Sequence, residues 1–388
     1  MSKKYIIIGN GVAGDSAALV LQQADLSADI KIFTTEKNPF YYRPRLVEYI
    51  SGEVDISKLT LHNEEWYSEQ GITLNLHQAI KAINPENKTV KTESAEYSYD
   101  KLLLACGSKP FIPPIEGIDK IKNCFPLRTI EDSDNIIKAC KTSKNAVIIG
   151  GGILGIETAY NLSLLGLVPS VIDNSKTLLS RQLDSESGKL LKEMLEEKNI
   201  QFLTGESTKS IIENNNIITL TMQSDKQIST DMIIVNTGVR PCIELAFDAG
   251  LNTNRGIIVN DRMQTSNKDI YAAGDCAEHK GIVYGVWMPS MQQGQSAGAN
   301  MAGGRKEYNG SLLSHKLKVA GIDLVSVGNI TEKSEEVLKT GNGYYKKALI
   351  TDNKITGCIL LGDISGERQI TRAINEKLNF SEVRPFFE

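Results

Sequence analysis

Three glycines near the start of the chain have a spacing that suits a phosphate-bearing ligand. Gly9, Gly11 and Gly14 follow a short apolar run and precede residues 15–23, which have the pattern of a helix. The first glycine permits a tight turn, the second lets the backbone approach a pyrophosphate, and the third lets helix and strand pack closely. Glu36 lies 22 residues past Gly14 at the end of a second apolar run, where a carboxylate can hold a ribose 2′-hydroxyl. The arrangement predicts a dinucleotide site.

The same spacing recurs in the middle of the chain, at Gly150, Gly152 and Gly155. An internal repeat of strand, glycine turn and helix is far more specific than either copy alone. Asp173 ends the next apolar run, 18 residues past Gly155, and Lys176 is the only cation near it in the sequence. A carboxylate without a neighbouring arginine favours the 2′-hydroxyl of NADH over the 2′-phosphate of NADPH. The chain is therefore predicted to bind two dinucleotides, one of them NADH.

Two further segments carry residues that suit contact with such ligands. Arg43 and Arg45 flank Pro44 in an aromatic-rich loop, where an arginine can neutralise a pyrophosphate and the proline fixes the backbone. A solvated loop with a structural proline is the alternative interpretation. Asp275 ends another apolar run, so it can accept hydrogen bonds from ligand hydroxyls or cap a following helix. The residues alone leave both pairs of alternatives open.

The cysteines show no spacing that would build a redox dithiol or a metal site. None of them pairs as C-x-x-C, C-x₄-C or C-x-x-H. Scattered cysteines of this kind are usually small buried hydrophobic residues. We therefore predict no metal site. The six positions are Cys106, Cys124, Cys140, Cys242, Cys276 and Cys358.

These candidate residues require a scaffold of more than one domain, because 388 residues are too many for one compact core. Two apolar strands end in glycine and proline, at residues 102–110 and 231–241, and these breaks indicate the entry and exit of an inserted domain. A helix is expected over residues 54–71. The tail after about residue 314 has the pattern of strands followed by a short helix.

The predicted fold class is α/β, with two Rossmann-like three-layer dinucleotide-binding domains plus a small α+β C-terminal domain. The first domain is expected to be discontinuous and the second to be inserted into it. The predicted boundaries are residues 1–112 and 245–312 for the first domain, 113–244 for the second and 313–388 for the tail.

Composition narrows the functional class. The net charge is −4 without long blocks of like charge, which argues against nucleic acid as the main partner. Apolar windows are short and interrupted by glycine, so no membrane span is expected. The N-terminus runs directly into a strand without a signal-peptide pattern, so a cytoplasmic location is expected.

Four segments, together with the two glycine motifs, carry a resemblance to a known family. They are Tyr-Tyr-Arg-Pro-Arg-Leu at 41–46, the stretch 150–157, Ser-Arg-Gln-Leu-Asp at 180–184 and Tyr-Ala-Ala-Gly-Asp at 271–275. Over essentially its full length the chain resembles the two-dinucleotide reductases of the pyridine nucleotide–disulfide oxidoreductase superfamily. Within it, the likeness is to NADH:rubredoxin oxidoreductases and the flavin module of nitrite reductase.

The resemblance implies resident FAD at the first glycine motif and NADH, as cosubstrate, at the second. Asp275 would then bind the ribityl chain, and Glu157 would lie near the edge where nicotinamide and flavin meet. The implied catalytic candidates are Glu157, Arg45 and Glu48. The implied FAD residues are Gly9, Gly11, Gly14, Glu36, Arg43, Arg45, Ala79, Ala105, Gly107, Gly274, Asp275 and Trp287. The implied NADH residues are Gly150, Gly152, Gly155, Glu157, Asp173, Arg181 and Gly238.

The departures from the family pattern are equally informative. Disulfide reductases carry C-x₄-C facing the flavin, and related oxidases carry one redox cysteine, but residues 33–71 contain no cysteine. In ferredoxin-reductase relatives a lysine pairs with the acid near the flavin, and Glu48 replaces that lysine in this chain. Arg45 is therefore expected to supply the cation instead. The tail lacks the long dimerisation domain of disulfide reductases, so a monomer is expected.

The expected function is an FAD-dependent reductase that takes hydride from NADH and passes electrons singly to a small redox protein, with rubredoxin as the expected acceptor. Because rubredoxins are acidic, docking is expected at a local basic patch. The candidate docking residues are Lys316, Lys318, Lys346, Lys347 and Arg45. The alternatives are an NADH oxidase or diaphorase that reduces oxygen or quinones, the reductase component of a nitrite reductase-like system, and an NADH-sensing flavoprotein.

Overall fold

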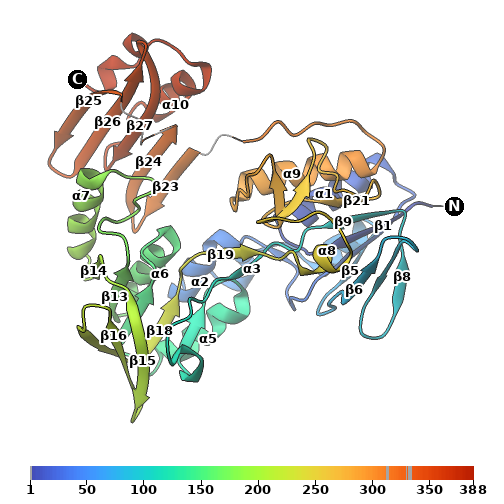
Figure 1. The fold of residues 1–388 in the computed structure, drawn as a ribbon, viewed down its shortest axis with the longest axis horizontal. Helices are drawn as coiled ribbons and strands as arrows, with labels where there is room; N and C mark the ends of the chain where they lie inside the picture. The colour runs from blue at the N-terminus through green and yellow to red at the C-terminus, as the bar shows by residue number, and fades with distance from the viewer. Residues whose placement is uncertain (1, 312–313, 329, 331–333) are drawn as a thin grey trace.

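The computed structural model describes residues 2–311, 314–328, 330 and 334–388, and three lobes are visible in it (Figure 1). The first lobe is built on a five-stranded parallel sheet with the order β21-β9-β1-β2-β5. Strands β1, β9 and β21 are near-continuous apolar runs, as expected when both faces of a parallel sheet are covered. Their bounds are β1 Lys4–Ile8, β2 Asp29–Phe33, β5 Ile72–Asn75, β9 Lys101–Leu104 and β21 Ile270–Ala272.

The first sheet lies between two helices and an antiparallel meander, which gives three layers (Figure 1). Helices α1 (Val12–Ala24) and α9 (Trp287–Met301) cross at glycines, because a Cβ at Gly294 or Gly298 would overlap backbone oxygens of α1. The meander consists of β6 Ala82–Asn84, β7 Thr89–Lys91 and β8 Glu96–Ser98. A smaller parallel pair, β20 Ile257–Val259 with β22 Ala277–His279, and helix α8 Glu244–Asp248 complete the lobe.

The second lobe repeats this plan with a parallel sheet of order β11-β18-β12-β13-β14. The bounds are β11 Cys124–Pro126, β12 Asn145–Ile149, β13 Val168–Asp173, β14 Gln201–Thr204 and β18 Met232–Val235. The helices are α5 Ile130–Cys140, α6 Ile153–Leu164, α7 Ser185–Glu196 and the short 3₁₀ turn η2 Ile118–Lys120. The meander is β15 Thr208–Asn214, β16 Ile217–Met222 and β17 Gln227–Thr230.

The first two lobes are joined where β10 (Ser108–Pro110) pairs antiparallel with β19 (Val239–Pro241). A second connection comes from a segment early in the chain, where helix α2 (Leu46–Ser51) follows the 3₁₀ turn η1 (Arg43–Arg45). Apolar side chains of this segment pack in the same core as α5 and α6: Tyr41, Leu46, Val47, Ile50 and Leu59. The second lobe is therefore held to the first by a core contact as well as by the strand pair.

The single helix expected over residues 54–71 is wrong. The structure has α3 Ile56–Leu59, then β4 Thr60–His62, then α4 Glu64–Glu69, and β4 pairs with β3 Phe40–Tyr41. Two N-caps explain the interruption: Asp55 accepts from the Lys58 N–H, and Asn63 accepts from the Trp66 N–H. Because each cap starts a new helix, the chain has room for a short strand between them.

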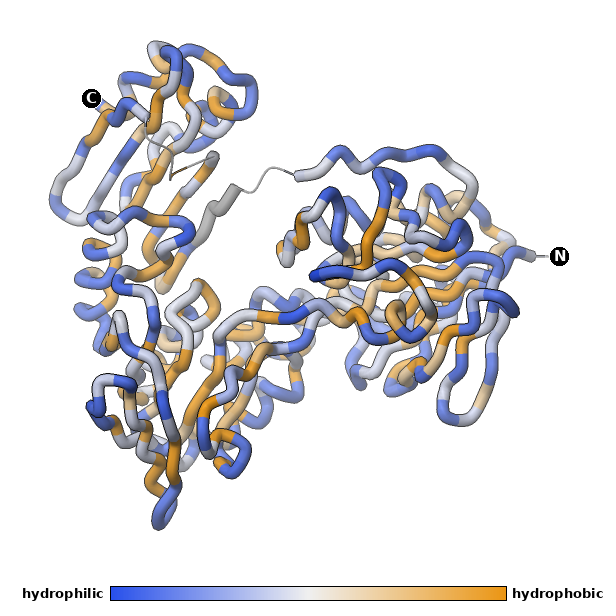
Figure 2. The backbone as a smooth tube through the Cα atoms, in the orientation of Figure 1, coloured by the Kyte–Doolittle hydropathy of each residue, from blue (hydrophilic) through white to orange (hydrophobic). Residues whose placement is uncertain are grey.

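The third lobe is an antiparallel sheet of order β23-β24-β27-β26-β25 with one helix. Its apolar residues pack partly among themselves and partly in the core of the second lobe. The hydropathy colouring shows apolar residues concentrated along the strands of the lobes and polar residues in the loops (Figure 2). The bounds are β23 Ser314–Val319, β24 Ile322–Gly328, β25 Glu335–Gly341, β26 Tyr344–Thr351, β27 Lys354–Leu361, α10 Glu367–Glu376, η3 Phe380–Glu382 and η4 Arg384–Phe386.

None of the helices within the described ranges has the length and apolar character that crossing a bilayer requires. The predicted fold class is confirmed: α/β, with two Rossmann-like three-layer units and a small α+β unit at the C-terminus.

Candidate functional site

The first glycine loop has the geometry of a phosphate cradle. Gly9 adopts a φ of +108°, and a Cβ there would overlap the carbonyl oxygen of Ala105. A Cβ at Gly14 would overlap the carbonyl oxygen of Gly9, so helix α1 can lie close to β1 only without a side chain. Gly11, in contrast, faces open space at the N-terminus of α1. The loop therefore fits the diphosphate of FAD, whose oxygens can approach free N–H groups there.

The second glycine loop repeats these features. Gly150 has a φ of +112° and faces the carbonyl oxygen of Asn236, Gly155 faces that of Gly150, and Gly152 faces open space. The Asp173 carboxylate accepts hydrogen bonds from the Gly151 N–H at 2.5 Å and the Ser175 N–H at 2.7 Å. An acid at the end of the second strand thus lies directly against the glycine turn, where a ribose hydroxyl of a bound nucleotide would approach it.

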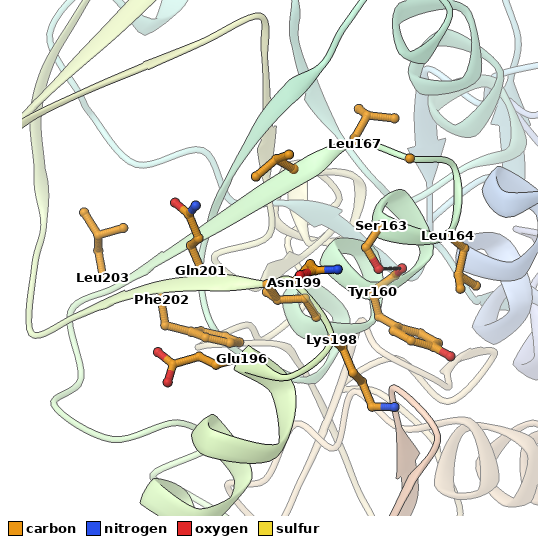
Figure 3. A pocket seen from close by; sticks show the side chains of 13 residues that line it. Tyr160, Ser163, Leu164, Leu167, Glu196, Lys198, Asn199, Gln201, Phe202 and Leu203 are labelled. Carbon is orange, nitrogen blue, oxygen red and sulfur yellow. Dashed lines mark hydrogen bonds between the residues drawn. The ribbon is translucent and has the colours of Figure 1, made fainter.

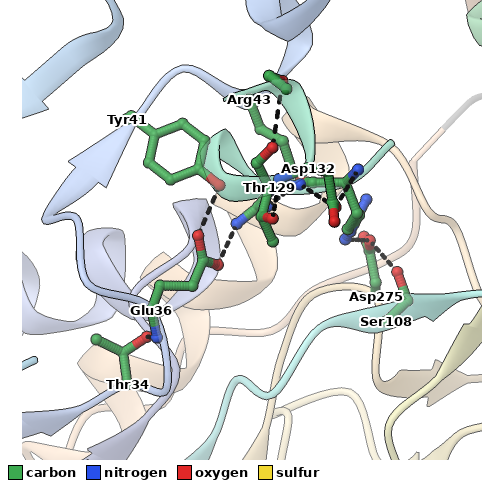
Figure 4. A network of polar contacts seen from close by, with 10 residues as sticks. Thr34, Glu36, Tyr41, Arg43, Ser108, Thr129, Asp132 and Asp275 are labelled. Atoms are coloured by element: carbon green, nitrogen blue, oxygen red, sulfur yellow. Dashed lines mark hydrogen bonds and ion pairs between the residues drawn. The ribbon is translucent and has the colours of Figure 1, made fainter. Parts of the chain in front are cut away.

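Glu36 belongs to a tight polar network beside the first glycine loop (Figure 4). Its carboxylate accepts from the Tyr41 hydroxyl at 2.6 Å and from Arg43 Nη2 at 2.7 Å. Arg43 Nη1 donates to the backbone carbonyl of Arg128, on the second lobe. The solvated-loop interpretation is wrong for Arg43, because its side chain is 21% exposed and anchored at both nitrogens.

Asp275 lies on the other side of the same region (Figure 4). It does not cap a helix, because strand β22 follows it. Its carboxylate accepts from Arg128 Nη2 at 2.7 Å, from the Ser108 hydroxyl at 2.9 Å and from the Ser290 hydroxyl at 3.3 Å. Side chains from three separate segments therefore converge on one carboxylate.

Arg128 is a site residue that the sequence interpretation missed. It directly precedes the Thr129–Asp132 capping box that starts α5, and Asp132 accepts from its backbone N–H at 2.9 Å. The capping box is readable in the sequence and predicts where α5 begins. The position of the Arg128 side chain against Asp275 depends on how the two lobes pack, which no local pattern encodes.

Glu157, Glu48 and Arg45 are brought together where α2 packs against α6. Glu157 Oε1 accepts from the Ala320 N–H of the third lobe at 3.0 Å. Burial, followed by the charges of Glu48 and Glu53, raises the pKa of Glu157 to about 7. Arg45 forms its ion pair with Glu48. The expectation that Arg45 compensates Glu157 is not met, since Arg45 instead pairs with the acid that stands in the lysine position.

Trp287 is the first residue of α9, and its ring packs on Phe40 at 5.8 Å and on Tyr42 at 4.7 Å between centroids. The remaining candidates lie around the same two nucleotide regions. Ala105 and Gly107 follow β9, Ala79 lies half-buried between β5 and β6, and Gly274 follows β21 with a φ of +83°. On the second lobe, Gly238 has a φ of +100° in open space, and Arg181 is exposed in the loop before α7.

Two of the lysines predicted to dock an acidic partner cannot do so. Lys346 is 2% exposed and pairs with Asp363 at 2.7 Å. Lys347 is 13% exposed and pairs with Asp184 at 3.1 Å and Glu336 at 2.8 Å. The alternation of side chains along β26 does not reveal this, because the carboxylates that pair with the two lysines lie outside that strand. Lys318 is exposed, whereas the side chain of Lys316 lies outside the described residues.

A cavity of about 920 Å³ lies away from both glycine loops (Figure 3). Its lining includes Val168 and Gln201, which start β13 and β14, together with the end of α6. Gly150 and Asp173 lie at the opposite, carboxyl ends of the strands, roughly 16 Å away along a six-residue strand. Ligands of open parallel sheets bind at the carboxyl ends, so we assign this cavity no part in nucleotide binding.

Comparison with known proteins agrees with this geometry. Residues 3–300 match the family described as pyridine nucleotide-disulphide oxidoreductase. The chain belongs to this family. Residues 314–378 match the rubredoxin NAD⁺ reductase C-terminal domain.

Relatives of this oxidoreductase include proteins with different acceptors. It is 38% identical over 388 residues to the NAD(P)H nitrite reductase of Bacillus subtilis. The match covers 98% of this chain and 48% of that protein. It is 33% identical over 386 residues to the NADH-rubredoxin oxidoreductase of Clostridium acetobutylicum, covering 98% and 97% of the two chains. The crystal structure of NADH:rubredoxin oxidoreductase from Clostridium acetobutylicum matches with a TM-score of 0.85 at 30% identity, covering 99% of this chain and 100% of that one.

The chain spans about half the length of the Bacillus subtilis relatives that it matches. Family membership makes it an NAD(P)H-dependent oxidoreductase, and the family uses FAD and NADH. The predictions of family, enzyme class and cofactors are thereby confirmed.

Proposed function

We propose that this oxidoreductase takes hydride from NADH and passes electrons one at a time to a small acidic redox protein such as rubredoxin. The observation that carries the proposal is the pair of glycine loops, each complete with an open glycine and a strand-end carboxylate, in a chain without a cysteine between residues 33 and 71. The match of the third lobe to a rubredoxin reductase C-terminal domain supports this acceptor class.

Residues 1–112 with 245–312 would hold FAD, and residues 113–244 would hold NADH. Bound FAD would supply the redox chemistry, because it accepts two electrons at once and can release them singly. The first loop and Asp275 would fix its diphosphate and ribityl chain, with Arg128 and Arg43 holding the region together. Asp173 would select NADH over NADPH.

The protein's own part is to position the two nucleotides. Glu157 lies where all three lobes meet, hydrogen-bonded to the third and close to Glu48 and Glu53. Its place on the first turns of α6, two residues after Gly155, suits contact with the nicotinamide end of a nucleotide held at the second loop. Arg45 and Glu48 neutralise each other beside it.

A steady-state screen tests the acceptor. NADH and NADPH are each combined with rubredoxin, ferredoxin, oxygen or a quinone, and initial rates are compared. We expect rubredoxin with NADH to give the largest kcat/KM. A rate with oxygen that rubredoxin does not increase would instead identify an oxidase, and assay of peroxide or water would name its product.

Exposed cations on the third lobe provide a docking test. Lys318→Glu is expected to raise the KM for rubredoxin roughly three- to tenfold, with the KM for NADH unchanged, because charge at a docking rim acts mainly on encounter. Lys189→Glu, which alters an exposed lysine on α7, is the matched control.

A second candidate is a reductase component that works beside a nitrite-reducing partner. The 38% identity to the Bacillus subtilis nitrite reductase, over half of that protein, favours it. This function predicts NADH oxidation that depends on nitrite only when a nitrite-reducing module is added to the assay.

A further inference from the structure

Asp15 is a buried acid at the first glycine loop. It follows Gly14, lies in the first turn of α1 and is 3% exposed. The N-terminus of this helix is where the FAD diphosphate would bind. A carboxylate one turn inside the same helix end adds a second negative charge close to the first, which opposes anion binding unless a cation balances it.

His62 is the residue placed to balance that charge. Its Nδ1 lies 2.8 Å from Asp15 Oδ1, and the Tyr67 hydroxyl lies 2.5 Å from the same oxygen. The ion pairs found among the described residues include His62 with Asp15 and no lysine or arginine with Asp15. Tyr67 cannot supply positive charge, and burial together with Asp15 raises its pKa, so it remains a neutral donor.

The ring of His62 has an aromatic neighbour as well as Asp15. Its ring stacks on Trp66 with a centroid separation of 3.6 Å and an interplanar angle of 6°. A cation over the face of an indole is stabilised by the ring quadrupole. The side chain of His62 is 24% exposed. Protons can therefore exchange with solvent.

We propose that His62 is protonated when FAD is bound and that this proton sets the affinity of the first glycine loop for FAD. The proposal rests on the assignment of FAD to that loop. The titratable groups in contact with His62 are Asp15 from α1 and Tyr67 from α4; its other ring neighbours, Phe40 from β3 and Trp66 from α4, do not titrate.

The sign of the pH dependence follows from the charges. At low pH the His62–Asp15 pair is neutral overall, and the helix end is free to hold the diphosphate. As the pH rises and His62 loses its proton, Asp15 is left as an uncompensated anion and FAD binds more weakly. Binding of FAD and of the proton are therefore linked, with each favouring the other.

The test measures the dissociation constant of FAD for the full-length chain by ultrafiltration, between about pH 6 and about pH 8.5, the range in which a histidine changes charge. For the wild type we expect the constant to rise about tenfold across this range, as one buried charge pair warrants. His62→Asn is expected to bind weakly at every pH. Asp15→Asn is expected to bind tightly at every pH, because both hydrogen bonds of Asp15 use Oδ1, which asparagine retains.

The double variant D15N/H62N separates charge from structure. It is expected to bind as tightly as D15N, whereas loss of a merely structural contact would weaken binding in all three variants. His77→Asn, which changes an exposed histidine, is the matched control and should behave as the wild type. If H62N does not fold, the D15N and double variants still decide the matter.

Two results would overturn the role of His62: an unchanged pH dependence in H62N, or weaker FAD binding by D15N than by the wild type at pH of about 8.5. The first would assign the titration to another group such as Glu157. Failure of the wild type to bind FAD at all would instead overturn the assignment of FAD to this loop, so the two failures are distinguishable.

Discussion

Glu157 shows how burial at a lobe boundary sets the behaviour of a single residue. Its carboxyl group lies on α6, close to Glu48 and Glu53, and accepts a hydrogen bond from the Ala320 N–H. Burial and two like charges disfavour the anion, and one hydrogen bond does not offset them, so the pKa of Glu157 is raised to about 7.

Glu157→Gln should therefore change the pH dependence of stability. Because the folded state holds the Glu157 proton to higher pH than the unfolded state, the wild type loses stability relative to the variant as pH rises from about 4.5 to about 7. The full change is at most about 3 kcal/mol. Denaturant unfolding of both proteins across this range is the measurement, and a stability difference that does not vary with pH would contradict a raised pKa at Glu157.

At the scale of elements, the glycine loops separate packing from binding. Gly14 must lack a side chain for α1 to reach β1, while Gly11 faces open space with an ordinary φ of −85°. The same division holds between Gly155 and Gly152 in the second loop. One glycine of each loop thus serves the fold, and the other leaves open space in which the proposed ligand would lie.

Gly14→Ala and Gly11→Ala should consequently fail in different ways. We expect Gly14→Ala to destabilise the chain by about 2–4 kcal/mol, because its Cβ overlaps backbone that cannot move freely. Gly11→Ala should stay within about 0.5 kcal/mol of the wild type yet lose FAD, since its methyl group enters the space that a diphosphate needs. Thermal unfolding and flavin content of the purified proteins distinguish the two, and equal stability losses would contradict the division.

Local patterns in the sequence predict these elements well and their assembly poorly. Glycine spacing and apolar runs predicted the glycine loops of both parallel sheets, because the turn, the helix start and the strand are neighbours in sequence. The prediction of one helix over residues 54–71 was wrong because Asn63 caps a second helix after a short strand. That strand is explained only by its pairing with β3. Arg128 escaped prediction because its partner, Asp275, lies 147 residues away.

At the scale of the whole molecule, the second and third lobes form a joint core. Asp184 caps α7 through the Ser187 N–H at 3.0 Å and also accepts from the Tyr345 hydroxyl at 2.7 Å and from Lys347 at 3.1 Å. Asp184 therefore both caps α7 and makes polar contacts between the second and third lobes. Lys347 failed as a docking prediction for the same reason: a strand-level pattern does not show which side chains a neighbouring lobe will cover.

Asp184→Ala should loosen the third lobe as well as α7. The loss of the cap and of two contacts across the boundary is expected to cost about 2–3 kcal/mol. Asp184→Asn, which keeps a capping oxygen but removes the charge facing Lys347, should cost less. Denaturant unfolding, with protease cleavage between the lobes as a second readout, checks this; equal effects of the two variants would show that the charge, not the cap, dominates.

Transfer of electrons one at a time from the holoenzyme to a small protein is best measured by anaerobic rapid mixing. Enzyme reduced with one equivalent of NADH is mixed with oxidised rubredoxin, and the bleaching of the rubredoxin iron is followed beside a matched experiment with oxygen. We expect two equivalents of rubredoxin to be reduced per NADH, faster than oxygen reoxidises the enzyme. Reduction by NADH followed by no bleaching of rubredoxin, or bleaching slower than reoxidation by oxygen, would contradict the proposed function.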